Sequence, residues 1–263
     1  RRFRRMENKV LSEADRVICI SETLRQEAIS RGVSKDKISI VPNAVDEEII
    51  GDSSELFSEL KEKLQDKLVV GYIGSLRELE GVDFTAKAVS ILNNRGIEAN
   101  FFVLSSKTGQ DDLRTYCQEL GIAEQSVIVG PVSHEQVAPF YDLIDVFVVS
   151  RPDTRVTRLV TPLKPFEAMR SGRAVVVADL PALAEIVDDG KTGRLYPVGD
   201  VDALVEVVEE LLDNEEIREH LGQNAQSWII ANRTWQSVTC NALEVYDKLV
   251  NDSLNFTKPS KNH

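Results

Sequence analysis

The residues best suited to chemistry stand together in the stretch that opens at Thr161. Pro162 and Pro165 both have a φ angle that suits the first turn of a helix, and Thr161 is placed to cap it. The start of such a helix offers free N–H groups and about half a positive charge to an anion such as a phosphate. Lys164 adds a full charge there, and Glu167 follows one turn later. This turn suits a nucleotide, with phosphates at its tip and ribose hydroxyls on the carboxylate.

A second turn with phosphate-binding character runs from Gly71 to Gly81. Glycine lets the backbone approach a phosphate, and Arg77 can hold one bidentately. Each feature also has a structural explanation: glycines form turns, and an acid such as Glu167 in the first turn of a helix favours the helix dipole. The two turns are informative together, because ligands of open α/β sheets bind beyond the carboxyl ends of the strands.

Strands and helices alternate around these turns. Apolar, β-branched runs predict strands at 68–73, 100–104, 126–129, 146–149, 174–177 and 193–196. Amphipathic stretches predict helices at 82–94, 111–120 and 134–143, from 183 onward, and at 200–212, 215–221 and 235–249. Strands alternating with helices of about ten residues predict an α/β fold, a doubly wound, Rossmann-like domain with a parallel six-stranded sheet.

The totals narrow the class of protein. The 263 residues allow one large domain or one domain with a substantial appendage, and 42% hydrophobic content supports a packed core. A net charge of −12 argues against non-specific nucleic-acid binding. Cys19, Cys117 and Cys240 are far apart, so we expect buried thiols in a reducing compartment, without a disulfide framework or zinc site. Without an apolar run of about 18 residues or a signal-like start, we expect a cytoplasmic protein.

The run Thr161 to Met169, T-P-L-K-P-F-E-A-M, resembles the donor-binding motif of GT-B fold, family 4 (group 1) glycosyltransferases. Together with Arg151-Pro152 and Arg158-Leu159-Val160 before it, it is similar to sugar transferases of bacterial surface-polysaccharide clusters. The resemblance implies a retaining, metal-independent transferase whose donor is a nucleoside-diphosphate sugar of the UDP or GDP type. It implies no cofactor. In such enzymes the leaving phosphate is thought to take the acceptor's proton on the same face.

The resemblance also implies roles for particular residues. Lys164 and Arg77 would stabilise the departing diphosphate, and Glu167 would bind the donor ribose. The donor-binding set is completed by residues of the surrounding turns: Gly74, Ser75, Val132, Arg155, Arg158, Thr161, Pro162 and Leu163. The chain departs from the family pattern at Leu159, where many members have a sugar-contacting Glu, and at Pro181-Ala182, where a glycine pair is usual. These departures leave the sugar less constrained than the nucleotide.

The beginning of the chain resembles the family's hinge region in the runs 15–21 and 38–46. We therefore expect residues 1–46 to end an N-terminal, acceptor-binding domain, so that the chain is the C-terminal half of a GT-B fold and a fragment of a longer enzyme. Further boundaries are predicted for a linker helix (47–66), the donor-binding domain (67–222), and a crossing helix with a polar tail (223–263). The partners implied are a nucleotide sugar, a glycan or lipid-linked acceptor and the missing N-terminal domain.

Several alternatives stay open. The four arginines between Arg1 and Arg5 suit either a solvated helix face or peripheral contact with anionic lipid at the inner face of the cell membrane. Asp200-Val201-Asp202 matches a DxD metal motif, but its place at a helix start favours capping. In place of a transferase, the chain could be a donor-binding subunit that is inactive alone, or another GT-B enzyme such as a phosphorylase or sugar-nucleotide epimerase. A receiver-like regulatory domain is disfavoured, because no acidic cluster stands at the strand ends.

Overall fold

A six-stranded parallel sheet lies at the centre of the protein, in the computed structural model that describes residues 2–47 and 51–256. The strand order is β5-β4-β3-β6-β7-β8. The strands are β3 (Leu68–Ile73), β4 (Ala99–Leu104), β5 (Ser126–Val129), β6 (Val146–Val149), β7 (Ala174–Ala178) and β8 (Arg194–Tyr196). The predicted fold class, a Rossmann-like α/β domain with six parallel strands, is confirmed.

The strand order reverses between β3 and β6. From β3 the chain moves outward through β4 to β5, and it then returns to place β6 on the other side of β3. Val70 of β3 pairs with Val146 of β6 at this reversal. In doubly wound sheets the loops after two such strands diverge and leave a crevice for a ligand. The fold therefore places a candidate site beyond Ile73 and Val149.

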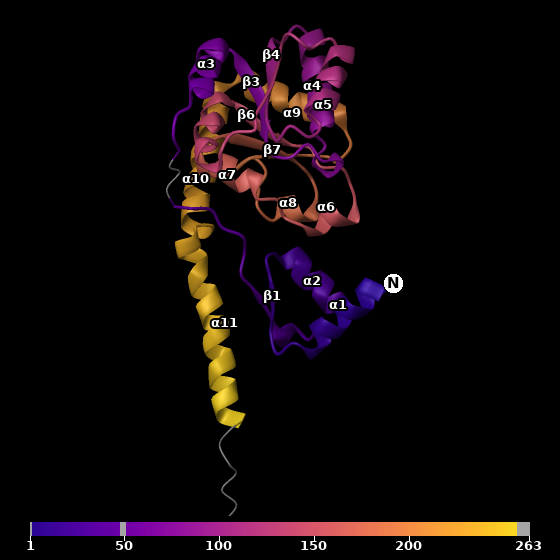
Figure 1. Cartoon of the computed structure of the whole chain (residues 1–263), viewed down its shortest axis with the longest axis vertical. Coiled ribbons are helices and arrows are strands. Elements are labelled where there is room, and N and C mark those ends of the chain that lie inside the picture. Colours follow the sequence, from indigo (N-terminus) through magenta and orange to yellow (C-terminus); the bar gives the residue numbers. More distant parts are fainter. Residues whose placement is uncertain (1, 48–50, 257–263) are drawn as a thin grey trace, which may run out of the picture.

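Helices cover both faces of the sheet (Figure 1). One face is covered by α4 (Val82–Asn94), α5 (Gln110–Glu119) and α9 (Val201–Asp213). The other carries α3 (Glu55–Leu64), the 3-10 helix η4 (Ala138–Leu143), α7 (Lys164–Arg170) and α10 (Glu215–Asn232). Because neither face meets water, every residue of β6 and β7 is buried.

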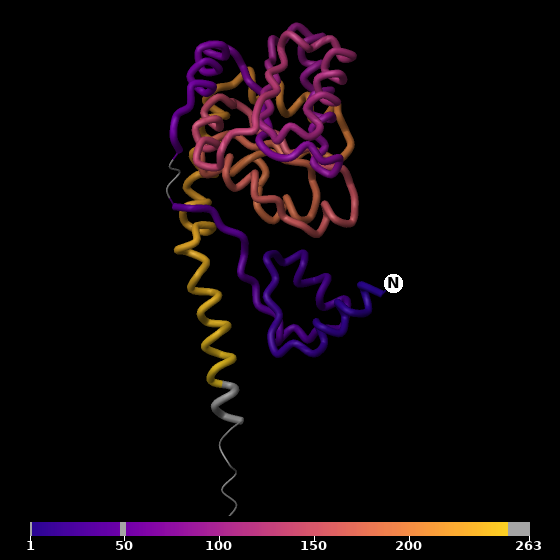
Figure 2. Tube along the Cα trace, viewed as in Figure 1, coloured from indigo at the N-terminus to yellow at the C-terminus, as the bar shows by residue number. Residues whose placement is uncertain are grey.

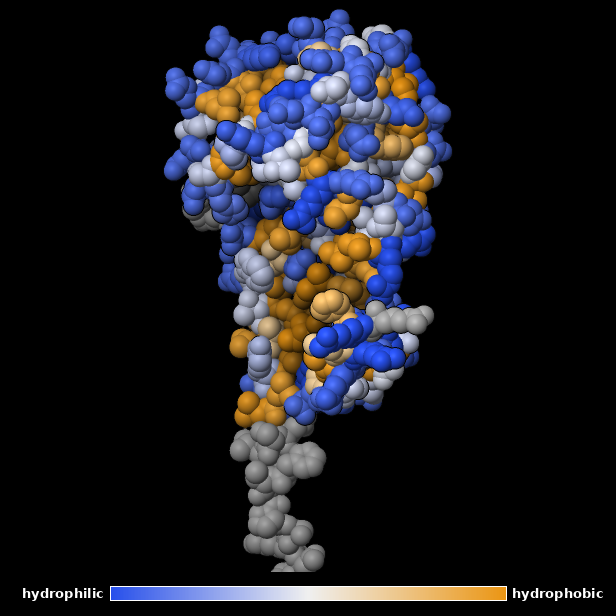
Figure 3. Space-filling view, turned by 45° about the vertical axis from the view of Figure 1, so that its right-hand side comes forward, coloured by the Kyte–Doolittle hydropathy of each residue, from blue (hydrophilic) through white to orange (hydrophobic). Residues whose placement is uncertain are grey.

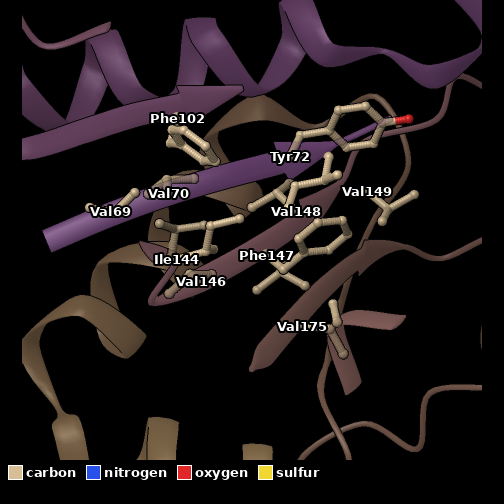
Figure 4. Packing of buried hydrophobic residues seen from close by; sticks show 14 of the residues in the cluster. Val69, Val70, Tyr72, Phe102, Ile144, Val146, Phe147, Val148, Val149 and Val175 are labelled. Atoms are coloured by element: carbon tan, nitrogen blue, oxygen red, sulfur yellow. The ribbon is translucent and has the colours of Figure 1, made fainter. Parts of the chain in front are cut away.

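The core between these layers is apolar and aromatic (Figure 4). The ring of Tyr72 stacks on that of Phe147 with 5.9 Å between centroids, and Phe102 stacks on Phe140 at 6.3 Å. Ile144 stands between β3 and β6 and would collide with any side chain added at Gly71. These contacts pack β3 closely against β6, so the carboxyl ends of the two strands have a fixed position relative to each other.

A small unit precedes the sheet. It contains α1 (Arg2–Glu13), β1 (Val17–Cys19), α2 (Glu22–Ser30), the 3-10 helix η1 (Lys35–Lys37) and β2 (Ile38–Ile40). Ser21 caps α2, its hydroxyl accepting from the N–H of Leu24 at 3.1 Å. The strands β1 and β2 pair in parallel, and the tube in Figure 2 shows the unit below the main domain. Arg1 lies outside the described residues.

The end of the chain runs back past this unit as the long helix α11 (Trp235–Phe256). Four of its apolar side chains fall on one face and are exposed: Trp235, Leu243, Tyr246 and Val250. Figure 3 shows apolar side chains gathered along this lower part of the molecule. None of the helices in residues 2–47 and 51–256 combines the length and the apolar character needed to cross a membrane.

Some expected elements differ. The helix predicted at 134–143 is two 3-10 pieces, η3 (His134–Gln136) and η4, because Pro139 removes an N–H from a regular α-helix. The helix predicted at 215–221 continues to Asn232, since Gly222 lets it lie against Gly172: an added Cβ would be 2.1 Å from that carbonyl oxygen.

Three further expectations need correction. The helix expected from residue 183 onward is the short α8 (Pro181–Ala184), and the last helix passes residue 249 to reach Phe256. The polar tail predicted for residues 251–263 is part of α11 as far as Phe256, and its remainder, 257–263, lies outside the described residues. Cys19 and Cys117 are buried as expected, but Cys240 is exposed, because it lies on a face of α11 that no described element covers.

Candidate functional site

The turn before Lys164 leads from the short helix α6 (Arg155–Leu159), which follows β6, into α7. The helix begins at Lys164 with Leu163 at the N-cap position, so the prediction that Thr161 caps it is wrong. The chain bends at Leu163 before the helix begins, so Thr161 stands two residues before the N-cap and does not cap the helix. Thr161 is 6% exposed, and its Oγ1 has no hydrogen-bond partner in the described structure. A buried hydroxyl without a partner is costly and is a feature of ligand sites.

Lys164 and Glu167 form an ion pair at the start of α7. The Nζ of Lys164 lies 3.0 and 2.9 Å from the two carboxylate oxygens of Glu167. Tyr141, from η4, donates its hydroxyl to Oε2 of the same carboxylate at 2.7 Å. Lys164 and Glu167 are partly exposed, whereas Tyr141 is buried. The buried Tyr141 hydroxyl thus orients the Glu167 carboxylate from the side of the core, and the carboxylate remains open to solvent.

Burial shapes the chemistry of Tyr141. Removal from water, reinforced by the charge and the hydrogen bond of Glu167, raises the pKa of the Tyr141 hydroxyl well above its usual value of 10.0. The phenol therefore stays protonated and acts as a donor at neutral pH. Sequence reasoning did not single out Tyr141. The sequence signal for a functional role of Tyr141 is weak, because a tyrosine in an apolar segment is usually interpreted as a core residue.

The turn after β3 carries Gly74, Ser75 and Arg77. The N–H of Gly74 donates to the carbonyl oxygen of Leu104 at 3.0 Å, and Ser75 is exposed. Arg77 stands before the 3-10 helix η2 (Glu78–Glu80); it is exposed and has no ion pair with another described residue. Its guanidinium is therefore free to meet an anion.

The loops after β3 and β6 are joined by Glu80 and Arg151. Nε and Nη2 of Arg151 donate to the two carboxylate oxygens of Glu80, each at 2.9 Å, and Nη1 donates to the carbonyl oxygen of Val160 at 3.1 Å. Both side chains of the pair are nearly buried. Glu80 stands where the resembled family more often has a cation, and its place in this pair accounts for the acid.

Arg155 and Arg158 lie on a short helix, α6 (Arg155–Leu159), where a loop was expected. Thr154 caps this helix by accepting from the N–H of Thr157 at 3.2 Å. Arg158 turns back to Asp153, with Nη2 2.7 Å from Oδ2, and Arg155 pairs with Glu27 of α2. Both guanidinium groups are exposed and paired with acids.

The end of α8 contacts the N-terminal unit. The carboxylate of Glu185 accepts from the backbone N–H of Glu22 at 2.8 Å and from that of Thr23 at 2.6 Å, and also from the Thr23 hydroxyl. It thereby occupies the positive end of α2. With the Arg155–Glu27 pair, this contact joins the small unit to the loops that follow β6 and β7. The sequence gives no local signal for it.

The remaining predicted site residues are dispersed around the turn. Val132 is half-buried against the core after β5, Pro162 is buried, and Leu163 is 48% exposed. A cavity of about 320 Å³ lies elsewhere, beside the edge strand β5, and includes Lys63 and Arg114 but none of the predicted residues. A smaller one of about 250 Å³ is lined by Arg4, Glu7, Arg31 and Arg155. We place the candidate site beyond the carboxyl ends of β3 and β6, at the turn that holds the unpartnered Thr161 hydroxyl and the Lys164–Glu167 ion pair.

A family model described as glycosyl transferases group 1 matches residues 53–228. The chain belongs to this family. A second model, glycosyltransferase family 4, matches residues 1–49. The first match spans the whole sheet together with α7, α8 and α9, so the group 1 region contains the candidate site.

Known members of the group 1 and GT-B classes are similar over part of their length. An α-D-kanosaminyltransferase of Streptomyces kanamyceticus is 27% identical over 64% of this chain and 43% of its own. The sucrose-phosphate synthase structure of Thermosynechococcus elongatus has a TM-score of 0.78 at 22% identity, covering 96% of this chain and 63% of that one. Anabaena Alr3699/HepE in complex with UDP-glucose has a TM-score of 0.74 at 20% identity, covering 94% and 67%. The chain thus spans between 43% and 67% of these proteins.

Proposed function

We propose that the chain is the donor-binding half of a retaining glycosyltransferase that uses a nucleoside-diphosphate sugar of the UDP or GDP type. The observation that carries the proposal is the ion pair between Lys164 and Glu167 at the start of α7, three residues after the buried Thr161 hydroxyl that has no partner in the described structure. The turn that holds these residues lies where the strand order reverses. The complex of Anabaena Alr3699/HepE with UDP-glucose, on the same fold, supports a nucleotide sugar.

Each group has a role in this proposal. Glu167 accepts the ribose hydroxyls, held in place by the Tyr141 hydroxyl. Lys164 and the exposed Arg77 meet the diphosphate, where negative charge grows as the sugar departs. Preorganised cations stabilise that charge without a metal ion, and the leaving phosphate takes the acceptor's proton. Gly74 and Ser75 offer backbone and hydroxyl groups from the facing turn, and Val132 lies near the base.

In this proposal a second domain binds the acceptor. The match of residues 1–49 to glycosyltransferase family 4 supports the idea that the small unit with α1 and α2 belongs to such a domain. The T-P-L-K-P-F-E-A-M run supports synthesis of cell-surface polysaccharide or glycoconjugate, with a glycan or lipid-linked acceptor. In this proposal the 263-residue chain binds donor by itself and needs the other domain for transfer.

Thermal unfolding in a panel of nucleoside diphosphates tests the proposal. UDP or GDP raises the melting temperature of the wild-type chain, and Glu167→Ala or Lys164→Ala abolishes the rise. Lys87→Ala, an exposed lysine on α4, is the matched control and keeps it. Equal shifts in the wild type and both site variants would refute the site, and no shift with any nucleotide would refute the donor class.

A further inference from the structure

The ion pair between Glu80 and Arg151 is unusual for its burial. The side chains are 12% and 7% exposed, and the guanidinium grips both carboxylate oxygens in a parallel fork. Glu80 ends the 3-10 helix η2 in the loop after β3, and Arg151 is the second residue after β6. The pair therefore bridges the two diverging loops at the reversal of the sheet.

Further contacts extend this bridge. The third nitrogen of Arg151 holds the carbonyl of Val160, the residue before the unpartnered Thr161. Ser150, the residue before Arg151, donates its hydroxyl to the carbonyl oxygen of Gly81 at 2.5 Å. Gly81 lies so close to the end of β6 that an added Cβ would be 2.0 Å from the Ser150 carbonyl oxygen. Two consecutive residues thus fix the loop after β3 and the Thr161 turn at once.

Stability alone does not account for the pair. Taking two charges out of water costs several kcal/mol, and apolar pairs of similar volume are often equally stable. What an apolar pair lacks is direction: the planar fork sets the distance and the orientation of the groups it joins. Such a pair suits a place where two loops must keep a fixed separation.

We propose that Arg151 and Glu80 are positioning residues that set the spacing between the two diphosphate-binding turns. The inference rests on the proposed function. The three guanidinium nitrogens of Arg151 are engaged by Glu80 and Val160, so it acts through the turns rather than by touching the donor. The pair therefore controls affinity for the diphosphate, which spans both turns. It leaves the base and the ribose, which meet Val132 and Glu167, unaffected.

The test compares nucleosides with nucleoside diphosphates. The variant Glu80→Met/Arg151→Met replaces the pair by apolar side chains of similar length. The control, Arg95→Met/Glu209→Met, removes an exposed ion pair between α4 and α9, away from the site. Binding of UDP, GDP, uridine and guanosine is measured by calorimetry and ligand-observed NMR, with the melting temperature recorded for each protein.

We expect the site variant to bind the diphosphate at least about tenfold more weakly, the loss of roughly one charge-assisted hydrogen bond. Nucleoside affinity stays as in the wild type, which a general structural defect would not produce. The variant Arg151→Lys keeps the positive charge but loses the planar fork, and we expect its affinity for the diphosphate to lie between those of the wild type and the double variant. If the double variant unfolds, Glu80→Gln gives the same comparison with volume retained.

The outcomes separate the two proposals. Equal diphosphate affinity in the wild type and the site variant overturns the positioning role and leaves the donor site standing. Equal losses for nucleoside and diphosphate overturn it as well, because they indicate loosened structure. A wild-type chain that binds no nucleotide overturns the proposed function, and this inference with it.

Discussion

Lys164 and Glu167 neutralise one another, with Nζ of the lysine 3.0 and 2.9 Å from the two carboxylate oxygens. In the proposed complex the two side chains have different partners, the diphosphate for the lysine and the ribose for the carboxylate. Donor binding therefore has to divide an existing ion pair. Because both groups are partly exposed, that pair costs little to break, within about 1 kcal/mol.

If donor binding separates Lys164 from Glu167, a substitution at Glu167 should have opposite effects on the binding of pyrophosphate and of a nucleoside. In Glu167→Gln, Lys164 loses its partner, so inorganic pyrophosphate binds as well as in the wild type or up to about fivefold tighter. Uridine or guanosine binds more weakly, because the amide no longer offers two acceptors to the ribose. Calorimetry with both probes checks this. Parallel losses of pyrophosphate and nucleoside would contradict the separate roles.

Arg77 is expected to matter for binding and not for stability. The Arg77→Met variant melts at the wild-type temperature, because the side chain is exposed and lacks an ion pair among the described residues. It binds UDP or GDP about tenfold more weakly, since a charge-assisted contact to phosphate is lost. Lys87→Met is the control, and titration followed by fluorescence or calorimetry is the measurement. Unchanged affinity would remove Arg77 from the site.

Glu185 is expected to hold the N-terminal unit against the domain of the six-stranded sheet. Glu185→Gln replaces the charged acceptor of the Glu22 and Thr23 amides with a neutral one, and hydrogen bonds to charged groups contribute about 1.5–3 kcal/mol. Amide exchange at these two residues then speeds up, while the central sheet keeps its protection. Glu206→Gln, on the exposed side of α9, serves as control. Unchanged exchange at both amides would show that the contact contributes nothing.

Two glycine substitutions separate steric collision from backbone strain. Gly81 and Gly96 both have positive φ, +65° and +90°, but only Gly81 has an atom in the way, the Ser150 oxygen at 2.0 Å. Gly96→Ala is expected to lower the free energy of unfolding by about 1 kcal/mol from strain alone. Gly81→Ala is expected to cost clearly more, about 3 kcal/mol or above. Urea denaturation measures both, and equal losses would contradict the close approach.

Buried tyrosines predict a loss of stability in alkali. Burial raises the pKa of Tyr196 above its ordinary value of 10.0, as it does for Tyr72 and Tyr141. Below the ordinary value both states are protonated and stability is complete. Above it the unfolded chain releases protons that the folded chain keeps, so the free energy of unfolding falls. Tyr196→Phe should lessen this fall by up to about 1.4 kcal/mol per pH unit, measured by urea unfolding between about pH 9 and about pH 11. An identical slope would contradict the expected protonation.

Local sequence patterns predicted the positions of many strands and helices well. The strand at 68–73 and the helix at 82–94 have the predicted ends, because apolar runs and flanking glycines act over a few residues. The cap assigned to Thr161 failed for the same reason: it assumed that the helix starts at the first proline, whereas the chain bends at Leu163 before the helix begins at Lys164. A local pattern cannot show that bend.

The candidate site was only partly accessible to such reasoning. Lys164 and Glu167 are three residues apart, so their meeting could be expected from helix geometry. The pairs Glu80–Arg151 and Arg155–Glu27 join residues 71 and 128 positions apart. Their partners are set by the order of strands and by the docking of α2, which no short motif encodes. The roles of the predicted residues in donor binding stay predictions.

The chain enters and leaves the domain of the six-stranded sheet at one place. The N–H of Val45 donates to the carbonyl of Arg233 at 2.8 Å, and the N–H of Trp235 donates back to Val45 at 3.2 Å. Val45 and Thr234 form a parallel bridge there. The backbone that enters the domain and the backbone that leaves it are thus hydrogen-bonded to each other at one point. Any rotation of the small unit about this point has to break both the contact of Glu185 with the Thr23 amide and the ion pair between Arg155 and Glu27.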